Sequence, residues 1–421
     1  MKSSYDNKIV HGFITAVPTN SFMSLDNQFS VKKKNSVLTL KSNKKFIHLD
    51  KNFIDWLVGF TDAEGNFNIS LKGLQGSKYN SLNLTYQITL HINDLYVLEY
   101  IRNRLNCGSI SKSGDKCNYF VNDQKSLINV IVPIFNYREL KSSKFFQYLN
   151  FKKAVHLLID KNHLTLKGKI DILQYYHDMK LINQNSKARE NMIIDEYWLI
   201  GFTEGDATFS SNKLKPKIKY ENHIKELELF KSILNYLKHG NLYTSDRKSA
   251  GSVILEINNI NILMNRIIPI FSKGMLTKKS LDFEDWSIIV KITYYGYHTL
   301  DEGKELIHLI KANMNNFRLN PDFLTNYDQN KALIEQKLNY LLSLPSPYEV
   351  KEGILFLRGT DKLVSKFFKI KVENTNGKIH YFTSISECSL TLNIPSKIIK
   401  NCLLSGLQHK NYTIKFDTII E

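Results

Sequence analysis

Hydrophobic and polar residues alternate strictly in two segments of the chain, residues 66–72 and 82–90. Because successive side chains of a strand point to opposite faces, this pattern predicts two half-buried β-strands. Gly73 and Gly76 lie between the segments and indicate the loop of a hairpin. One face of the hairpin is therefore expected to be apolar and to pack on helices, while the other carries amides, hydroxyls and a lysine.

Helical spacing flanks this hairpin on both sides. The elements expected are, in order, helix 54–63, strands 66–72 and 82–90, helix 94–106, strands within 109–121 and helix 125–158. Asp55 is a candidate N-cap of the first helix. Pro133 is expected to interrupt the last one, because proline cannot donate the helical hydrogen bond. The order is therefore α-β-β-α-β-β-α.

The same pattern occurs twice. Residues 56–64 (Trp-Leu-Val-Gly-Phe-Thr-Asp-Ala-Glu) return as residues 198–206 (Trp-Leu-Ile-Gly-Phe-Thr-Glu-Gly-Asp). Further pairs follow in the same order: His91 with His223, Pro133 with Pro269, and Lys144 with Lys279. Similarity that keeps its order over several blocks indicates two copies of one half-domain, with insertions and deletions in the loops.

The repeat sets the expected domain organisation. The predicted parts are a basic N-terminal arm (1–50), a first half-domain (51–165), a linker (166–191), a second half-domain (192–310), a helical extension (311–347) and a C-terminal module (348–421). The fold class is α+β, with tandem αββαββα half-domains. Because both copies lie in one chain, we expect a monomer that is internally a pseudodimer.

Small residues and acids share fixed positions in the repeated segment. Gly59 and Ala63 are four residues apart, as are Gly201 and Gly205, so two helices could approach closely about a pseudo-twofold axis. Packing of this kind would bring Glu64 and Asp206 together at one end of the pair. Two like charges in contact are costly unless a cation lies between them, and Mg²⁺ suits such oxygen ligands. The alternative is ordinary solvated charge in a structural pseudodimer.

Composition favours a polyanionic partner. The 421 residues include 57 Lys+Arg and 40 Asp+Glu, a net charge of +17, and 43% are hydrophobic, which is enough for globular domains. No apolar run approaches the ~18 residues of a membrane helix, so no membrane partner is expected. The four cysteines fit neither a disulfide framework nor a zinc motif and are interpreted as reduced thiols. A soluble protein that is merely basic is the alternative.

The polar faces of the predicted strands are candidate DNA contacts, since amides and hydroxyls read base edges and lysines neutralise phosphates. The candidates are Asn66, Asn68, Ser70, Lys72, Asn83, Thr85, Gln87 and Thr89 in the first copy, and Thr208, Ser210, Lys213, Lys215, Lys217 and Lys219 in the second. A plain solvated sheet face remains the alternative.

Residues 57–65 and 199–207 resemble the two signature motifs of the LAGLIDADG homing endonucleases, in particular the single-chain, two-motif members encoded in organellar introns. The resemblance implies two saddle-shaped antiparallel sheets on the major groove of a long double-stranded DNA site. It also implies Mg²⁺-dependent cleavage of both strands. A carboxylate-held metal beside a DNA-binding face would suit hydrolysis of phosphodiesters.

The resemblance assigns roles by position. Glu64 and Asp206 take the place of the catalytic, metal-binding acids, and the carbonyls of Ala63 and Gly205 would also face the metals. Lys144 and Lys279 would stabilise charge near the scissile phosphate; the alternatives are generic phosphate contacts or solvated helix charge. The family's closing glycine is Gly65 in the first copy but Ala207 in the second. Since alanine tolerates the left-handed conformation poorly, we expect a shifted turn and a perturbed second metal site.

The C-terminal residues indicate a small module. Asn376-Gly377 predicts a hairpin turn, and two short helices follow, the second from Ser396 to Leu404. The segment is similar to the nuclease-associated modular DNA-binding repeats, which implies a helix-turn-helix with Lys397 and Lys400 toward DNA. The burial expected for this arrangement covers Ile394, Ile398, Ile399 and Leu403. A structural tail is the alternative.

Two functions remain open. The first is a site-specific DNA endonuclease; the alternative is a maturase that binds group I intron RNA and assists splicing, with or without residual cleavage. The excess of Lys over Arg, with abundant Asn, Ile, Tyr and Phe, is typical of an AT-rich genome. With no visible transit peptide, this predicts translation inside a mitochondrion.

Overall fold

A computed structural model describes residues 37–42, 45–76, 78–185, 189–245, 251–315, 321–351, 354–365, 367–382 and 384–419. The first 36 residues of the predicted basic arm lie outside these ranges. The chain forms two compact units: the tandem unit, within residues 16–293 and 306–334, and the C-terminal unit, within 294–305 and 335–421. In the described part of the chain, every helix is too short or too polar to cross a membrane.

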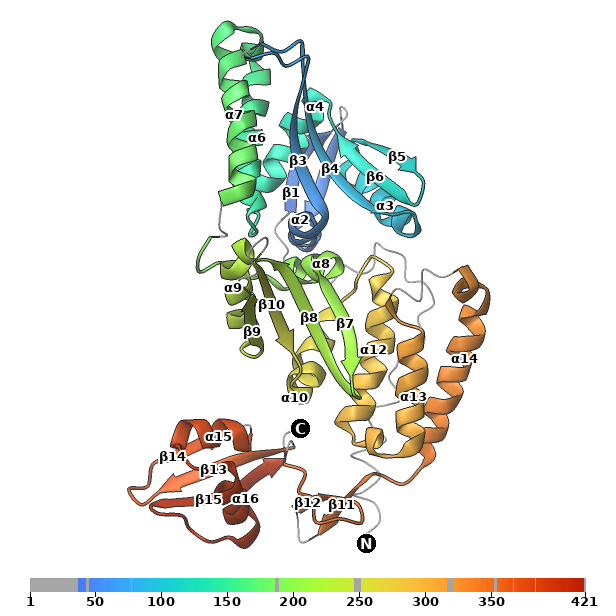
Figure 1. Ribbon diagram of the computed structural model, residues 1–421, viewed down its shortest axis with the longest axis vertical. Helices are drawn as coiled ribbons and strands as arrows, with labels where there is room; N and C mark the ends of the chain where they lie inside the picture. The colour runs from blue at the N-terminus through green and yellow to red at the C-terminus, as the bar shows by residue number, and fades with distance from the viewer. Residues whose placement is uncertain are drawn as a thin grey trace. The chain divides into compact units, whose positions relative to one another are not determined.

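The first half of the tandem unit contains one four-stranded antiparallel sheet in the order β3-β4-β6-β5 (Figure 1). Its elements are α2 (Lys51–Glu64), β3 (Gly65–Lys72), β4 (Ser81–His91), α3 (Leu95–Leu105), β5 (Ser109–Ser113), β6 (Lys116–Val121), α4 (Gln124–Ser126), a π-helical turn (Leu127–Ile131), α5 (Val132–Tyr137), α6 (Lys144–Ile159) and α7 (Leu166–Asn185).

The second half repeats this course with the sheet order β7-β8-β10-β9. Its elements are α8 (Glu196–Asp206), β7 (Ala207–Asn212), β8 (Lys215–His223), α9 (Leu227–Leu237), β9 (Asn241–Ser245), β10 (Ser252–Ile257), α10 (Ile260–Ile262), a π-helical turn (Leu263–Ile267), α11 (Ile268–Phe271) and α12 (Lys279–Tyr294). The predicted α+β class with tandem αββαββα halves is confirmed. Helices α13 (Asp301–Ala312) and α14 (Pro321–Ser343) follow.

Alternation along the strands produces one buried and one open face in each sheet. Phe67 and Ile69 are buried while Asn66 and Asn68 are exposed. The Phe67 ring lies 5.1–5.3 Å from the rings of Phe135, Tyr148 and Phe151, on helices α5 and α6. In the second half, Phe209 takes the matching place and packs on Phe271, Phe283 and Trp286. Helices therefore cover one face of each sheet and leave the polar face open.

Helices α2 and α8 lie side by side between the two sheets (Figure 1). A Cβ atom built on Gly59 would lie 2.0 Å from the carbonyl oxygen of Trp198, and one on Gly201 would lie 2.1 Å from that of Trp56. At the other end of the pair, a Cβ on Gly205 would lie 2.3 Å from that of Ala63. The close helix packing expected from the small residues is therefore present.

Two local predictions were wrong. The first helix is capped by Asp50, whose side chain accepts a 2.9 Å hydrogen bond from the Phe53 amide, and not by Asp55. Asp55 lies inside the helix, buried, and pairs with Lys51 and with Arg138 at 2.8 Å. Pro133 does not break the helix either: it stands in the first turn of α5, where a missing N–H costs little. The chain leaves the helix only after Tyr137.

Segments expected to be irregular also have structure. Residues 37–42 and 45–50, placed in the basic arm, form a pair of antiparallel strands, β1 (Val37–Ser42) and β2 (Lys45–Asp50), whose Leu40 and Leu49 are buried. The expected linker contains α7, which packs on α6 and brings Tyr175 to within 5.6 Å of the Lys153 amine.

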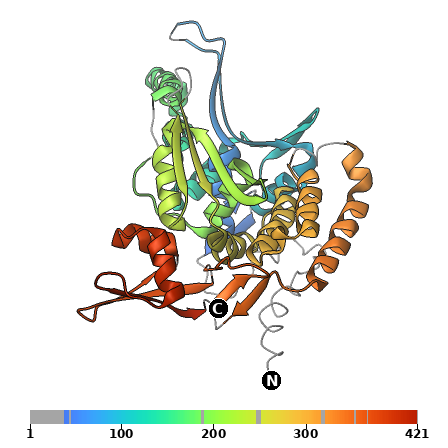
Figure 2. The same ribbon diagram turned by 60° about the horizontal axis from the view of Figure 1, so that its bottom comes forward.

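The C-terminal unit has its own small core. Its elements are β11 (Tyr348–Lys351), β12 (Ile354–Leu357), β13 (Phe368–Asn374), β14 (Ile379–Phe382), α15 (Ile385–Leu392), α16 (Ser396–Ser405) and β15 (Tyr412–Ile419). The two helices lie on one face of a three-stranded sheet, β14-β13-β15 (Figure 2). Gly377 makes the predicted hairpin turn with φ 77°, and the Ser384 side chain caps α15. The sequence pattern did not predict strand β15.

Candidate active site

The two predicted acids meet at the C-terminal end of the helix pair. Glu64 is the last residue of α2, Asp206 is the last residue of α8, and a Cβ atom on Gly205 would lie 3.0 Å from a Glu64 carboxylate oxygen. The prediction that helix packing brings the two carboxylates together agrees with this geometry. The sheets of both halves start directly after them, since β3 begins at Gly65 and β7 at Ala207.

Both carboxylates are poorly solvated. Burial raises the pKa of Glu64, opposed by the nearby Lys144 and Lys279 ammonium groups. Burial likewise raises the pKa of Asp206 to about 6; Lys144 lowers it, Glu64 raises it, and a 2.9 Å hydrogen bond from the Asn222 amide lowers it. Burial is the dominant cause in both cases, because low dielectric disfavours the charged form. The pair is therefore costly to ionise without a cation.

Lys144 and Lys279 lie beside these acids. The Lys144 ammonium donates to the carbonyl oxygens of Ala63 at 2.7 Å and Thr61 at 3.2 Å. The Lys279 ammonium donates to Ala207 and, at 3.5 Å, to Gly205. Burial lowers the pKa of both lysines, and the surrounding carboxylates raise it. Six predicted residues, Ala63, Glu64, Lys144, Gly205, Asp206 and Lys279, thus share one site.

The donors fit a hard divalent cation that keeps several waters. Among the described residues, no cluster of three or more His, Cys, Asp and Glu side chains forms a closed metal cage. The two carboxylates and the adjacent carbonyls of Ala63 and Gly205 are oxygen donors, and the described residues provide Glu64 with no hydrogen-bond donor. Few carboxylates, with other positions left to water or phosphate, is the arrangement that Mg²⁺ accepts.

The expected disturbance at Ala207 is absent. Gly65 has φ −80° and ψ 159°, and Ala207 has φ −110° and ψ 157°, so both are extended and neither is left-handed. Their backbone N–H groups donate to the equivalent carbonyls of Thr61 and Thr203. The prediction of a shifted turn was wrong, because the position requires no positive φ. The second half therefore enters its sheet as the first half does.

Two buried acids of the motifs have a clear structural role that the sequence reading passed over. The Asp62 carboxylate accepts from the amides of Lys141 and Ser142 at 2.8 and 3.0 Å and from the Trp198 indole of the other half at 2.8 Å. The Glu204 carboxylate makes the matching set.

Glu204 accepts from the amides of Leu276 and Thr277 at 2.8 and 2.7 Å and from the Trp56 indole at 2.9 Å. Each of these acids therefore holds in place the loop that precedes one lysine of the site. Each also holds in place a tryptophan of the opposite half. The sequence signal was present: an acid and a tryptophan recur in register in both copies.

The open face of the first sheet is polar and partly cross-linked. Asn66 pairs with Gln87 across the strands, and Asn68 with Thr85. Gln87 donates to Thr89 and to Asn118, each at 3.0 Å. Asn66, Asn68, Lys72 and Asn83 are exposed, whereas Ser70, Thr85, Gln87 and Thr89 are half-buried.

The open face of the second sheet is less basic than expected. Lys217 pairs with Glu256 at 2.6 Å, and Lys219 pairs with Glu221 at 2.5 Å. Neither glutamate was among the candidates. Thr208, Ser210 and Lys215 share this face, while Lys213 lies in the turn with φ 45°. The sheet therefore carries acceptors as well as cations toward its open side.

The two remaining candidates belong to the C-terminal unit. Lys397 is exposed and Lys400 is half-buried, both on α16. Ile394, Ile399 and Leu403 are buried as expected, and Ile398 is partly buried. All four cysteines are described, buried and without a disulfide, in agreement with reduced thiols.

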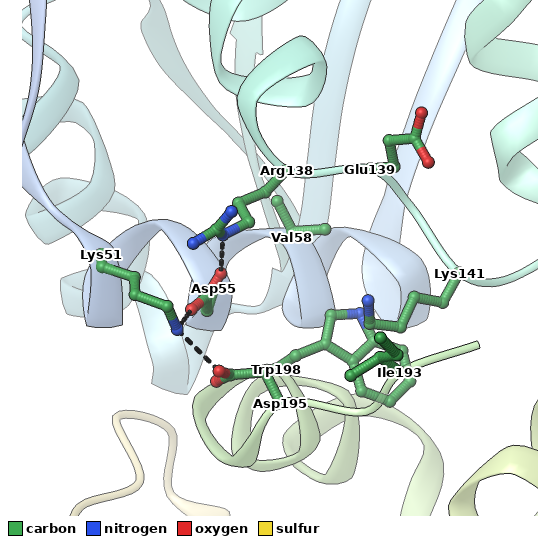
Figure 3. Close-up of a pocket in the computed structure, with 9 residues that line it drawn as sticks. All are labelled: Lys51, Asp55, Val58, Arg138, Glu139, Lys141, Ile193, Asp195 and Trp198. Atoms are coloured by element: carbon green, nitrogen blue, oxygen red, sulfur yellow. Dashed lines mark hydrogen bonds and ion pairs between the residues drawn. The ribbon is translucent and has the colours of Figure 1, made fainter. Parts of the chain in front are cut away.

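A pocket of about 280 Å³ opens at the opposite, N-terminal end of the helix pair (Figure 3). There the Lys51 ammonium bridges the halves by pairing with Asp55 and, at 2.7 Å, with Asp195. Because Lys51 and Glu64 lie at opposite ends of α2, this pocket is separate from the two acids. Its charges pair with one another and stabilise the interface between the halves.

Comparison with known proteins identifies the repeated part of the chain. The family model described as LAGLIDADG endonuclease matches residues 57–155 and 199–290. The mitochondrial protein RF1 of Saccharomyces cerevisiae is 27% identical over 417 residues, covering 90% of this chain and 84% of that protein. The probable intron-encoded endonuclease Cox1-I1b of Schizosaccharomyces pombe is 26% identical over 301 residues, covering 69% and 76%. The intron-encoded RNA maturase bI4 of Saccharomyces cerevisiae is 23% identical over 253 residues, covering 58% and 33%.

Solved structures agree. The LAGLIDADG homing endonuclease I-GzeII in complex with its DNA target is 28% identical, with a TM-score of 0.55, over 63% of this chain and 99% of that chain. The meganuclease I-SmaMI bound to uncleaveable DNA is 26% identical, with a TM-score of 0.56 and the same coverage. The resemblance seen in the two motifs is confirmed: residues 57–155 and 199–290 match the model of the LAGLIDADG endonuclease family.

Proposed function

We propose that this protein is a site-specific homing endonuclease that hydrolyses both strands of a long double-stranded DNA site with the help of Mg²⁺. One observation carries the proposal: two half-buried carboxylates, each beside a half-buried lysine, meet at the end of a pseudo-twofold helix pair from which two polar sheets begin. The family relatives I-GzeII and I-SmaMI have structures in complex with DNA, which supports double-stranded DNA as the partner.

The chain's residues divide the work by position. Glu64 and Asp206, with the carbonyl oxygens of Ala63 and Gly205, would hold the metal. A divalent cation bound there supplies Lewis-acid stabilisation of phosphate charge. Lys144 and Lys279 lie where an ammonium group stabilises negative charge that develops on a phosphate. The open faces of the two sheets orient the duplex through base edges and phosphates.

The test replaces each acid by its amide. Glu64→Gln and Asp206→Asn should each abolish double-strand cleavage in Mg²⁺ and leave specific DNA binding within about tenfold, because phosphate contacts by the sheets are retained. Plasmid cleavage and a gel-shift titration measure the two quantities. Glu99→Gln, an exposed residue of α3, is the matched control and should cleave normally. A Glu64→Gln protein that still cuts both strands would contradict the assignment.

RNA maturation is the second candidate, favoured by the similarity to the maturase bI4. Splicing of the host group I intron RNA, with and without the protein, measures this activity beside plasmid cleavage. The regular backbone at Ala207 removes an argument that the second acid site is impaired, so endonuclease activity remains the main proposal.

The location follows from the relatives. RF1 is named as a mitochondrial protein. The prediction of a mitochondrial location, which was made from the amino-acid bias typical of an AT-rich genome, is confirmed.

A further inference from the structure

The two lysines of the site stand at equivalent helix starts. Lys144 is the first residue of α6, and Lys279 is the first residue of α12. Amides at a helix start have no acceptor within the helix and therefore need partners from elsewhere. The direction of each lysine depends on how this first turn is fixed.

A carboxylate from the opposite half supplies one of these partners. The Ser143 amide, directly before Lys144, donates to both oxygens of Glu226 at 3.2 and 3.0 Å. The Lys278 amide, directly before Lys279, donates to Asp94 at 2.8 Å. Glu226 belongs to the second half and serves the first-half lysine, whereas Asp94 belongs to the first half and serves the second-half lysine.

Asp94 and Glu226 are equivalent residues of the repeat. Each ends a short 3₁₀ turn that follows the second strand of its half, Ile92–Asp94 and Ile224–Glu226. Each turn is capped by a histidine: the His91 Nδ1 accepts from the Asn93 amide at 3.2 Å, and the His223 Nδ1 accepts from the Lys225 amide at 3.1 Å. The exchange of carboxylates between the halves is therefore reciprocal and is built into the repeated sequence.

The crossed contacts complete a frame around each lysine. Asp62 lies in the same half as Lys144 and accepts hydrogen bonds from the amides of residues 141–142, directly before Ser143. Glu204 lies in the same half as Lys279 and accepts from the amides of residues 276–277, directly before Lys278. Glu226 is only 3% exposed, and a carboxylate that deep is tolerated only when hydrogen bonds satisfy it. Each lysine helix thus begins at a point fixed by one carboxylate from each half.

We propose that Asp94 and Glu226 are crossed positioning residues: Asp94 sets the place of Lys279, and Glu226 sets the place of Lys144, each across the pseudo-twofold interface. Their catalytic importance rests on the proposed nuclease function, in which the lysines stabilise phosphate charge. Their positional role stands on the contacts alone. The arrangement makes each half's lysine dependent on the correct docking of the other half.

Lysine reactivity tests the crossing without any cleavage. The full-length metal-free protein is labelled with acetic anhydride, and mass spectrometry of peptides gives the labelling rate of each lysine. Asp94→Ala should raise the rate of Lys279 by about threefold or more, the effect of losing one charged hydrogen bond, and leave Lys144 unchanged. Glu226→Ala should do the reverse. Lys215, exposed on β8, is the internal reference.

Amide variants keep the test valid if an alanine variant fails to fold. Asp94→Asn and Glu226→Gln retain an accepting oxygen but lose the charge, so the crossed change should be smaller and in the same direction. Equal changes at both lysines would indicate general loosening and overturn the proposal. A change at the own-half lysine, or none at either, would overturn it as well.

Strand-resolved cleavage then connects position to activity. On a duplex with both strands end-labelled, Asp94→Asn should slow the same strand as Lys279→Met, and Glu226→Gln the same strand as Lys144→Met. If the natural protein cuts no DNA, the proposed function fails while the labelling result still decides the positional role. If it cuts and the Asp94 and Lys279 variants affect different strands, the crossed assignment is wrong.

Discussion

Asp206 holds a charge at a position that is unfavourable for stability. Its pKa is raised to about 6, mainly by burial, from an ordinary value near 4. Because the folded state binds this proton more tightly than the unfolded chain does, ionisation weakens the fold as pH rises from about 4 to about 6. Glu64, whose pKa is also raised by burial, adds to this cost. The two acids therefore lower the stability of the fold at the place where the proposed metal ion would bind.

The first prediction concerns stability. Asp206→Asn mimics the protonated acid and should stabilise the metal-free protein by about 2 kcal/mol at pH 8, after allowance for partial exposure. The gain should be fully present above pH 6 and disappear below about pH 4. Urea denaturation at both pH values measures it. Glu99→Gln should change stability by less than about 0.5 kcal/mol. A variant less stable than the natural protein at pH 8 would contradict this account.

The affinity of the site for a divalent metal ion should depend on the protonation of Asp206. Since a bound divalent cation requires ionised carboxylates, its affinity should fall about tenfold for each pH unit below 6. Isothermal titration with Mg²⁺ or Mn²⁺ at pH 5, 6 and 8 gives the dependence. In Asp206→Asn the overall affinity should be lower and the dependence weaker, because one of the two titrating ligands is gone. An affinity that is the same at pH 5 and pH 8 would argue against this pair as the ligands.

At the scale of elements, the helix pair α2 and α8 is the most constrained feature. A methyl group on Gly201 would lie 2.1 Å from the Trp56 carbonyl oxygen and 2.8 Å from the Phe60 nitrogen. Both are backbone atoms of α2, so they move only if the helices separate. The small residues are needed here for close approach and not for a special backbone angle.

Gly201→Ala should therefore destabilise the tandem unit by about 3 kcal/mol or more, at the upper end for overpacking. Gly76→Ala is the matched control. Nothing lies within 4 Å of its added methyl group, and only its left-handed φ of 58° costs about 1 kcal/mol. Urea denaturation of both variants measures the difference. Equal losses in the two proteins would show that the helix contact is not rigid.

The elements that sequence reasoning found are those with a strong local period. Strict alternation identified β3 and β4, and small residues beside acids identified the helix pair. The start of α2 was misplaced because Asp50 and Asp55 are both plausible caps, and only the preceding hairpin decides between them. Pro133 was misread because a π-helical turn before it relieves the need for its N–H.

At the scale of the whole molecule, long-range contacts explain what the sequence could not provide. Asp62, Glu204, Asp94 and Glu226 are bonded to residues far along the chain, and no local pattern names such partners. The same holds for Glu256, which pairs with Lys217 of another strand and partly neutralises the open face of the second sheet. The repeat could reveal that an acid recurs in register, as Asp62 and Glu204 do, but not which residues it contacts.

The C-terminal unit allows a test of whether helix α16 contributes to DNA binding. Lys397 and Lys400 lie on α16, whereas Lys369 and Lys415 lie on the open face of β13 and β15, away from the helices. If α16 contacts the phosphate backbone, each lost contact should reduce the slope of log affinity against log salt by about 0.9.

Lys397→Gln with Lys400→Gln in the full-length protein should therefore flatten that slope by about one to two units on a long duplex, for one or two lost contacts. The same double change at Lys369 and Lys415 removes equal charge from the other face and should leave the slope nearly unchanged. Fluorescence anisotropy titrations at salt concentrations between about 50 and 200 mM measure the slopes of both double variants. Equal slopes for the α16 variant and the natural protein would make this unit a packing appendage. Equal losses in both double variants would show diffuse attraction by net charge and no helix-specific contact.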